Sequence, residues 1–192
     1  MLRDEYPDDK NYWSFLADRA NSRKQYPLAE QVSREGLEQW PDEVPLLYAL
    51  AMSLSFQNRN PEAIPVLENI LLLDENFVMA LNALGYILAE EKRDLERALD
   101  LVNKALKQRP DDVNILDSLA WVYYQMRNYQ EAWRIIKKCV ATDVGEATIW
   151  EHYGDIALAV HNKSEASRGY AKALELDADN STEIRNKLER LK

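Results

Sequence analysis

The sequence repeats with a period of about 34 residues, and this period limits the fold more than any other feature. Successive units start 34, 34, 35 and 34 residues apart, at Lys10, Val44, Val78, Val113 and Ala147. Allowing for one extra residue in the third unit, the twentieth place is always alanine: Ala29, Ala63, Ala98, Ala132 and Ala166. Such a period indicates stacked copies of one supersecondary unit, none of which buries its apolar face alone.

Each unit is predicted to contain two antiparallel helices, at roughly places 1–14 and 17–31. Places 4, 7, 8 and 11 fall on one helical face, because successive residues turn by about 100°. The eighth place is always small, which allows a close approach of the partner helix: Ala17, Ala51, Gly85, Ala120 and Gly154. The 5 Gly and 7 Pro among 192 residues are too few for a loop-rich all-β protein.

Proline marks the helix boundaries in the second unit. Asn60 and Pro61 predict an N-cap followed by proline at the first helical position. Pro65 lies inside the same predicted helix, where it removes a hydrogen bond. We therefore expect a local kink at Pro65.

Two stretches carry a family resemblance: WEHYGDIALA with EASRGYAKALELDAD, and LNALGYILAEEKRDLERALDLVNKALKQRPDD. Both resemble the tetratricopeptide repeat. The resemblance implies an all-α, right-handed α-solenoid of five helix pairs with a C-terminal capping helix. The predicted segments are an N-terminal extension (1–9), five units (10–43, 44–77, 78–112, 113–146 and 147–180) and the capping helix (181–192). The sequence of units three to five is also similar to the C-terminal part of longer bacterial repeat proteins, which include envelope lipoproteins.

The candidate binding surface lies on the second face of the first helices. In this family that face lines a concave groove, the usual site for an extended peptide or a helix. In units two to four the face combines aromatic anchors with adaptable methionine. The candidate groove residues are Tyr48, Met52, Phe56, Met79, Asn82, Tyr86, Asp117, Trp121 and Tyr124. Met52 and Tyr86 fit a core between repeats equally well, whereas the Asn82 amide suits a peptide backbone.

Charge narrows the class of partner. The groove places hold no Lys or Arg but several carboxylates: Asp18, Glu90, Asp117, Glu151 and Asp155. The Lys and Asn residues that grip the C-terminal carboxylate of chaperones in this family are therefore missing, and we expect a protein or peptide partner that is apolar with basic residues. The net charge of −9, from 24 basic and 33 acidic residues, argues against nucleic acid.

No catalytic, cofactor or metal motif stands out. The histidines lie nine residues apart, at His152 and His161, without the spacing of a metal site. Glu151, His152 and Asp155 form a carboxylate–imidazole cluster within one turn, which is more often a surface mixture than a metal site. Cys139 occupies a place that is small in other units, and we expect it to be buried and inert. The sequence thus predicts a non-catalytic scaffold or adaptor without a cofactor.

An alternative function is structural assembly. Four aromatic residues cluster near the N-terminal end of the array, and this end could pair with another copy: Tyr12, Trp13, Phe15 and Trp40. The sequence shows no signal peptide and no apolar run near the ~18 residues that span a bilayer. We therefore expect a soluble chain of unknown compartment: the cytoplasm as written, or the cell envelope if the chain is a fragment of a longer lipoprotein.

Overall fold

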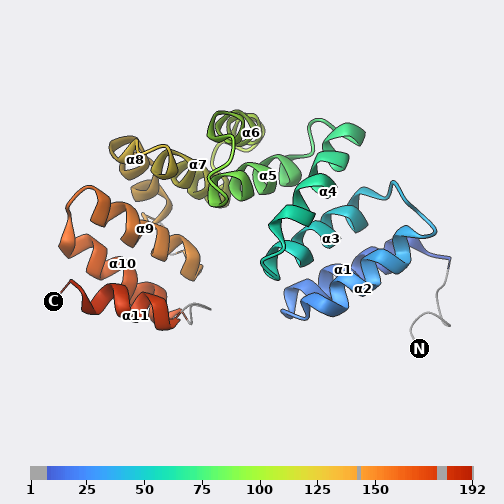
Figure 1. The fold of residues 1–192 in the computed structure, drawn as a ribbon, viewed down its shortest axis with the longest axis horizontal. Coiled ribbons are helices and arrows are strands. Elements are labelled where there is room, and N and C mark those ends of the chain that lie inside the picture. The colour runs from blue at the N-terminus through green and yellow to red at the C-terminus, as the bar shows by residue number, and fades with distance from the viewer. Residues whose placement is uncertain (1–7, 142–143, 177–180, 192) are drawn as a thin grey trace. The chain divides into compact units, whose positions relative to one another are not determined.

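The computed structural model describes residues 8–141, 144–176 and 181–191. Within these residues the chain forms eleven α-helices and no strand, so the all-α prediction is confirmed (Figure 1). The helices are α1 (Lys10–Ser22), α2 (Tyr26–Leu37), α3 (Val44–Phe56), α4 (Asn60–Leu73), α5 (Val78–Glu90), α6 (Leu95–Gln108), α7 (Val113–Gln125), α8 (Tyr129–Cys139), α9 (Ala147–Ala159), α10 (Lys163–Glu175) and α11 (Ser181–Glu189).

The odd-numbered helices α1 to α9 begin at the residues from which the five units were counted. The turn inside each pair also repeats, because place 15 of every unit adopts a left-handed backbone conformation. These residues are Lys24 (φ 58°), Asn58 (φ 60°), Lys92 (φ 51°), Arg127 (φ 61°) and His161 (φ 62°). None is glycine, although a positive φ normally favours glycine. The repeat therefore fixes backbone geometry as well as side-chain size.

The helix α4 departs from the predicted boundary by one residue. It begins at Asn60, so Arg59 is its N-cap and Pro61 lies inside the first turn. Proline is tolerated there because the first amides of a helix have no partner within the helix. The helix continues through Pro65 to Leu73, and Pro65 lies on the exposed side. The predicted kink at Pro65 stays a prediction.

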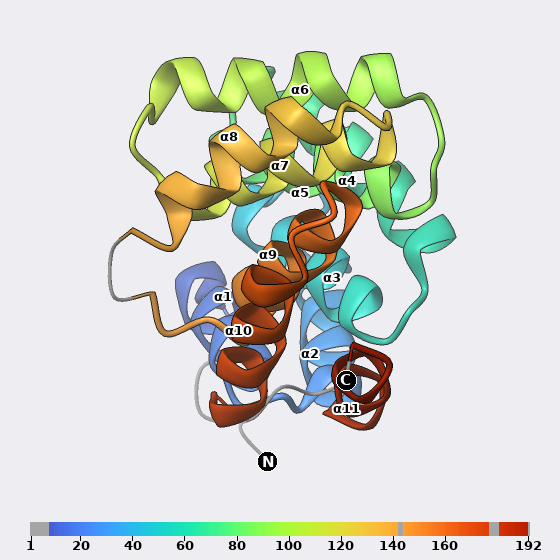
Figure 2. The same ribbon diagram turned by 90° about the vertical axis from the view of Figure 1, so that its left-hand side faces the viewer.

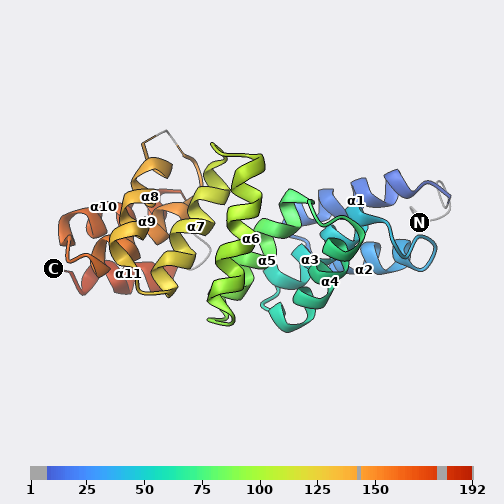
Figure 3. The ribbon, with the colours of Figure 1, turned by 90° about the horizontal axis from the view of Figure 1, so that it is seen from above.

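The chain divides into two compact units, residues 1–87 and 88–192. In the N-terminal unit α1 contacts α2 and α3, α2 contacts α3, and α3 contacts α4 (Figures 1 and 3, blue to teal). Its core includes Trp13, Ala17, Leu46 and Ala49, with Trp40 packed against them. Two of the four aromatic residues expected at an open N-terminal end thus pack into this core.

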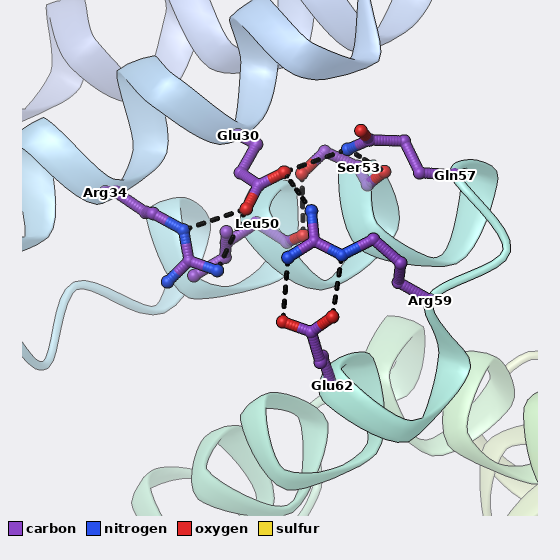
Figure 4. A network of polar contacts seen from close by, with 7 residues as sticks. All are labelled: Glu30, Arg34, Leu50, Ser53, Gln57, Arg59 and Glu62. Carbon is purple, nitrogen blue, oxygen red and sulfur yellow. Dashed lines mark hydrogen bonds and ion pairs between the residues drawn. The ribbon is translucent and has the colours of Figure 1, made fainter.

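A polar network ties α2 to the end of α3 and the start of α4 (Figure 4). Glu30 is at its centre and accepts hydrogen bonds from Arg34 (2.9 Å), Gln57 (3.0 Å) and Arg59 (2.6 Å). Arg59 also pairs through two nitrogens with Glu62, both at 2.7 Å. Burial opposes the charge on Glu30, but the donors outweigh it and lower the pKa of its carboxyl group. The network holds neighbouring helix pairs in one register.

In the C-terminal unit α6 contacts α7 and α7 contacts α8 (Figure 3). The α9–α10 pair (Figure 2, orange to red) packs closely, because Gly154 and Gly169 lie where the helices meet. A Cβ added at Gly154 would lie 2.5 Å from the Tyr170 ring. The last helix, α11, packs on α10 and buries Ile184.

Candidate functional site

The first part of the candidate site is a stripe of three side chains along α3, here called the α3 stripe: Tyr48, Met52 and Phe56. Their spacing of four residues places them on one helical face. Phe56 is 50% exposed, and Tyr48 and Met52 are half-buried. The stripe therefore keeps apolar surface in contact with solvent within the N-terminal unit.

Two aromatic rings that the sequence analysis did not select flank the ends of the α3 stripe. Phe77, just before α5, meets the Tyr48 ring edge-on with centroids 5.8 Å apart. Tyr26, at the start of α2, stacks on Phe56 at 4.8 Å. Both lie outside the groove places of the first helices, so periodicity alone missed them. Their position next to a helix start was the available signal.

The α5 candidates lie in the same unit and differ in exposure. Met79 is 40% exposed, and Asn82 and Tyr86 are half-buried. Among the residues described, the Asn82 Oδ1 atom is buried without a hydrogen-bond partner. An unpaired buried acceptor is costly and is satisfied when a donor approaches. The Asn82 oxygen is therefore unpaired and closed off from solvent, and the predicted contact with a peptide backbone stays a prediction.

One carboxylate contributes to the electrostatics of the α3 stripe. Asp18 on α1 is exposed and forms no salt bridge within the described part of the chain. Burial, together with the charge of Asp18, raises the pKa of the Tyr48 hydroxyl to about 12. Tyr48 is thus neutral across physiological pH, and the stripe has an acidic neighbour.

The three candidates on α7 have a different environment. Asp117 is 6% and Trp121 8% exposed, and both pack in the contact between α7 and α9. Asp117 holds His152 Nδ1 with both carboxylate oxygens, at 2.9 and 3.0 Å. The Trp121 ring stacks on His152 at 4.0 Å and on Tyr124 at 4.7 Å, and its Nε1 donates to Glu90. Packing within the C-terminal unit thus uses most of their surface, and only Tyr124 stays half-exposed.

Two further acidic candidates of the C-terminal unit, Glu151 and Asp155, are neutralised internally. Lys187 on α11 pairs with Glu151 at 3.0 Å and with Asp155 at 2.9 Å. Burial opposes the charge of His152, but Asp117 outweighs it and raises the pKa of the imidazole. The acidic face predicted for α7 and α9 is therefore occupied by basic groups of the following helices.

The described residues also bear on metal binding and thiol chemistry. They contain no group of three or more His, Cys, Asp or Glu side chains arranged to hold a metal ion. Cys139 is buried, as predicted, and burial with the nearby charge of Asp117 raises the pKa of its thiol to about 12. A thiol with this pKa is a poor nucleophile near neutral pH. Among the described helices, none combines the length and apolar character needed to cross a membrane.

The nine predicted groove residues therefore fall into two groups. Six lie on α3 and α5 in the N-terminal unit, where Phe56 and Met79 are clearly exposed. Three lie on α7 in the C-terminal unit, where Asp117 and Trp121 are buried. The exposed apolar part of the candidate site is thus formed by the N-terminal unit.

Comparison with known proteins gives one consistent family. Two tetratricopeptide repeat family models match residues 48–113 and 115–148. The TPR repeat-containing protein PA4667 of Pseudomonas aeruginosa is 31% identical over 160 residues, which cover 83% of this chain and 25% of that protein. The chain thus spans about a quarter of the length of this relative.

Solved structures share the fold at low sequence identity. TTC0263, a thermophilic TPR protein of Thermus thermophilus, matches with a TM-score of 0.77 at 19% identity, covering 95% of this chain and 98% of that one. A chain of the Cut9–Hcn1 complex matches with a TM-score of 0.85 at 14% sequence identity, covering 99% of this chain and 38% of that one. YrrB, a TPR protein with an unusual peptide-binding site, matches with a TM-score of 0.61 at 17% sequence identity, covering 97% of this chain and 95% of that one. These likenesses show the α-solenoid fold class.

Proposed function

The chain belongs to the tetratricopeptide repeat family, and from this premise we propose that its α3 stripe binds an apolar, basic segment of a partner protein. Members of this family are generally non-catalytic scaffolds for protein–protein interaction. The segment bound is an extended peptide or a helix.

The observation that carries the proposal is the exposed apolar surface of the α3 stripe. Phe56 leaves half of its surface to water while stacked on Tyr26, so its ring is both accessible and held in place. Aromatic side chains held in this way lose little conformational entropy on binding. Met52 beside it is flexible enough to adapt to a ligand. The combination is typical of interface anchors.

The chemistry of the partner follows from charge and from the unpaired acceptor. Asp18 neighbours Tyr48 and would attract a lysine or arginine of the ligand. Asn82 on α5 is half-buried, and its unpaired amide oxygen would accept from a peptide N–H once the side chain turned towards the ligand. The proposed surface does not extend to α7, where packing within the C-terminal unit already uses Asp117 and Trp121. The predicted ligand is thus apolar with at least one basic residue.

Self-association is the second candidate, and one observation favours it. Phe15 on α1 is 54% exposed with Arg19 above its ring at 5.9 Å, and Leu28 on α2 is 47% exposed. If the chain forms a dimer through this region, the molar mass measured by light scattering should fall from that of a dimer to that of a monomer when Phe15 is replaced by serine. A wild-type chain that remains monomeric at high concentration would remove this alternative.

The proposed function is tested by selecting random peptides from a display library on the wild-type chain and on Phe56→Ser in parallel. We expect peptides with apolar and basic residues to be recovered from the wild type and lost from the variant. Peptides kept by both baits bind elsewhere. The control is Leu72→Ser, which removes a leucine that is 85% exposed on α4, outside the stripe. Identical peptide pools from wild type and Phe56→Ser would contradict the proposal.

A further inference from the structure

A second surface lies on the C-terminal unit and shares no residue with the candidate groove. It is a pocket of about 500 Å³ between the end of α8 and the start of α10, with α9 at its floor. Trp133 on α8 forms one wall. This residue belongs neither to the small-residue columns of the repeat nor to the candidate groove. Its half-exposed indole is therefore an aromatic group without an assigned role.

Aromatic rings and cations alternate in this pocket. The Trp133 and Tyr153 rings lie 5.0 Å apart at 44°. Lys137 lies 5.4 Å from the centre of the Trp133 ring, and Arg168 lies 5.2 Å from Tyr153. Arg168 also lies 5.7 Å from Trp150. Cations stacked on ring faces are held in position with part of their hydration removed.

The pocket carries more hydrogen-bond donors than its own acceptors use. Arg168 donates to the Tyr153 hydroxyl at 2.8 Å and pairs through Nε with Glu165 at 2.8 Å. Its other guanidinium N–H groups have no partner among the residues that the structure describes. Lys137 forms no ion pair within the residues that the structure describes. The Asn162 Oδ1 atom accepts from the Glu165 amide, so its NH₂ group remains available. Glu165, the acidic residue of the lining, is already engaged by Arg168 and Tyr153.

Anions are favoured at this position by the backbone as well. Asn162 caps α10, a helix of 13 residues whose N-terminus borders the pocket. The partial positive charge at a helix N-terminus adds to that of Lys137 and Arg168. This local excess of positive charge occurs in a chain whose net charge is −9. The pocket thus differs from the acidic chain as a whole, and its positive charge favours an acidic ligand.

We propose that this pocket binds an acidic peptide segment of a partner protein, with a carboxylate side chain at Lys137 and Arg168 and an adjacent apolar side chain on the Trp133 ring. The Trp133 and Tyr153 rings already contact each other at 5.0 Å, so the apolar side chain of the ligand would rest against their solvent-facing edges. Charge-assisted hydrogen bonds would fix the carboxylate. The proposal is independent of the function assigned to the α3 stripe. The two surfaces have opposite preferences, because Asp18 beside the α3 stripe attracts basic ligands.

The test is a fluorescence-anisotropy titration of the intact chain with a labelled pentapeptide, two glutamates on each side of a phenylalanine. A glutamine version, in which all four glutamates are replaced, measures the contribution of charge. Lys137→Gln removes the free cation of the pocket. Lys138→Gln is the matched control, because it removes the same charge from the next exposed position of α8 but does not line the pocket.

We expect saturable binding of the glutamate peptide, weakened about fivefold or more by Lys137→Gln and less than about twofold by Lys138→Gln. The glutamine peptide should bind about tenfold more weakly or not at all. Added salt should weaken the glutamate peptide in the wild type. Absence of saturable binding to the wild type would overturn the proposal. Equal losses in the two lysine variants would overturn it too, since they would reflect net charge rather than the pocket.

Discussion

At the scale of single residues, the repeat places five non-glycine residues in the left-handed backbone region. At Arg127, for example, φ is 61°, and its amide donates to the Tyr124 carbonyl at 2.9 Å while the chain turns into α8. An L-residue with a side chain pays roughly 1–2 kcal/mol for this conformation. The turn is thus stabilised by the packing on either side of it rather than by its own residue.

Replacing Arg127 by glycine should therefore raise the melting temperature by about 1–3 °C, because glycine adopts a positive φ without steric cost. Thermal unfolding followed by circular dichroism measures the change. The control is Arg134→Gly in the middle of α8, where glycine lowers helix stability and the melting temperature should fall. A decrease for Arg127→Gly equal to that of Arg134→Gly would contradict the left-handed turn.

At the scale of helices, small residues decide how closely α9 and α10 pack. A Cβ on Gly169 would lie 2.8 Å from the Gly154 backbone nitrogen, where no flexible side chain can move aside. A Cβ on Gly154 would instead meet the Tyr170 ring at 2.5 Å. Either addition forces the two helices apart, since packed interiors have no spare volume.

Gly154→Ala and Gly169→Ala should each reduce the free energy of unfolding by about 1–3 kcal/mol, despite the better helix propensity of alanine. Chemical denaturation of both variants provides the measurement. Gly145→Ala serves as the reference, because a Cβ there has no atom within 4 Å. Unchanged stability of both helix variants would mean that α9 and α10 are farther apart than described.

The contact between α7 and α9 contains a buried titrating pair, Asp117 and His152. Asp117 raises the folded-state pKa of His152 above its ordinary value of 6.5. The pair therefore contributes stability that is fully present below about pH 6.5 and is lost as pH rises through the folded pKa. The charges of Glu90 and Asp155 also raise the pKa of the imidazole, so they add to the same pH dependence of stability.

Asp117→Asn should consequently lower the melting temperature most near pH 6, and the difference from wild type should shrink towards pH 9. The change to asparagine preserves shape and removes the charge. Trp121 stacks on His152, so its fluorescence reports the same contact. A melting-temperature difference that is independent of pH would show that the ion pair does not stabilise this junction.

At the scale of the whole molecule, the sequence predicted helices better than it predicted exposure. The period of 34 residues placed the first helices at their observed starts, because size constraints at places 8 and 20 recur in every unit. The α3 stripe followed from a spacing of four residues. Tyr26 and Phe77 were missed because neither lies on a first helix, and each contacts the stripe from a position far away in sequence. The burial of Asp117 and Trp121 was missed because periodicity does not say which neighbouring side chain, here His152, will cover a face.

The proposed function places partner binding on the α3 stripe of this repeat protein. The most direct measurement is a calorimetric titration of a display-selected peptide into wild type, Phe56→Ser and Leu72→Ser. We predict an affinity loss of about tenfold or more for Phe56→Ser and none for Leu72→Ser, with unchanged helical spectra. Equal affinity for wild type and Phe56→Ser would place the ligand elsewhere and contradict the claim.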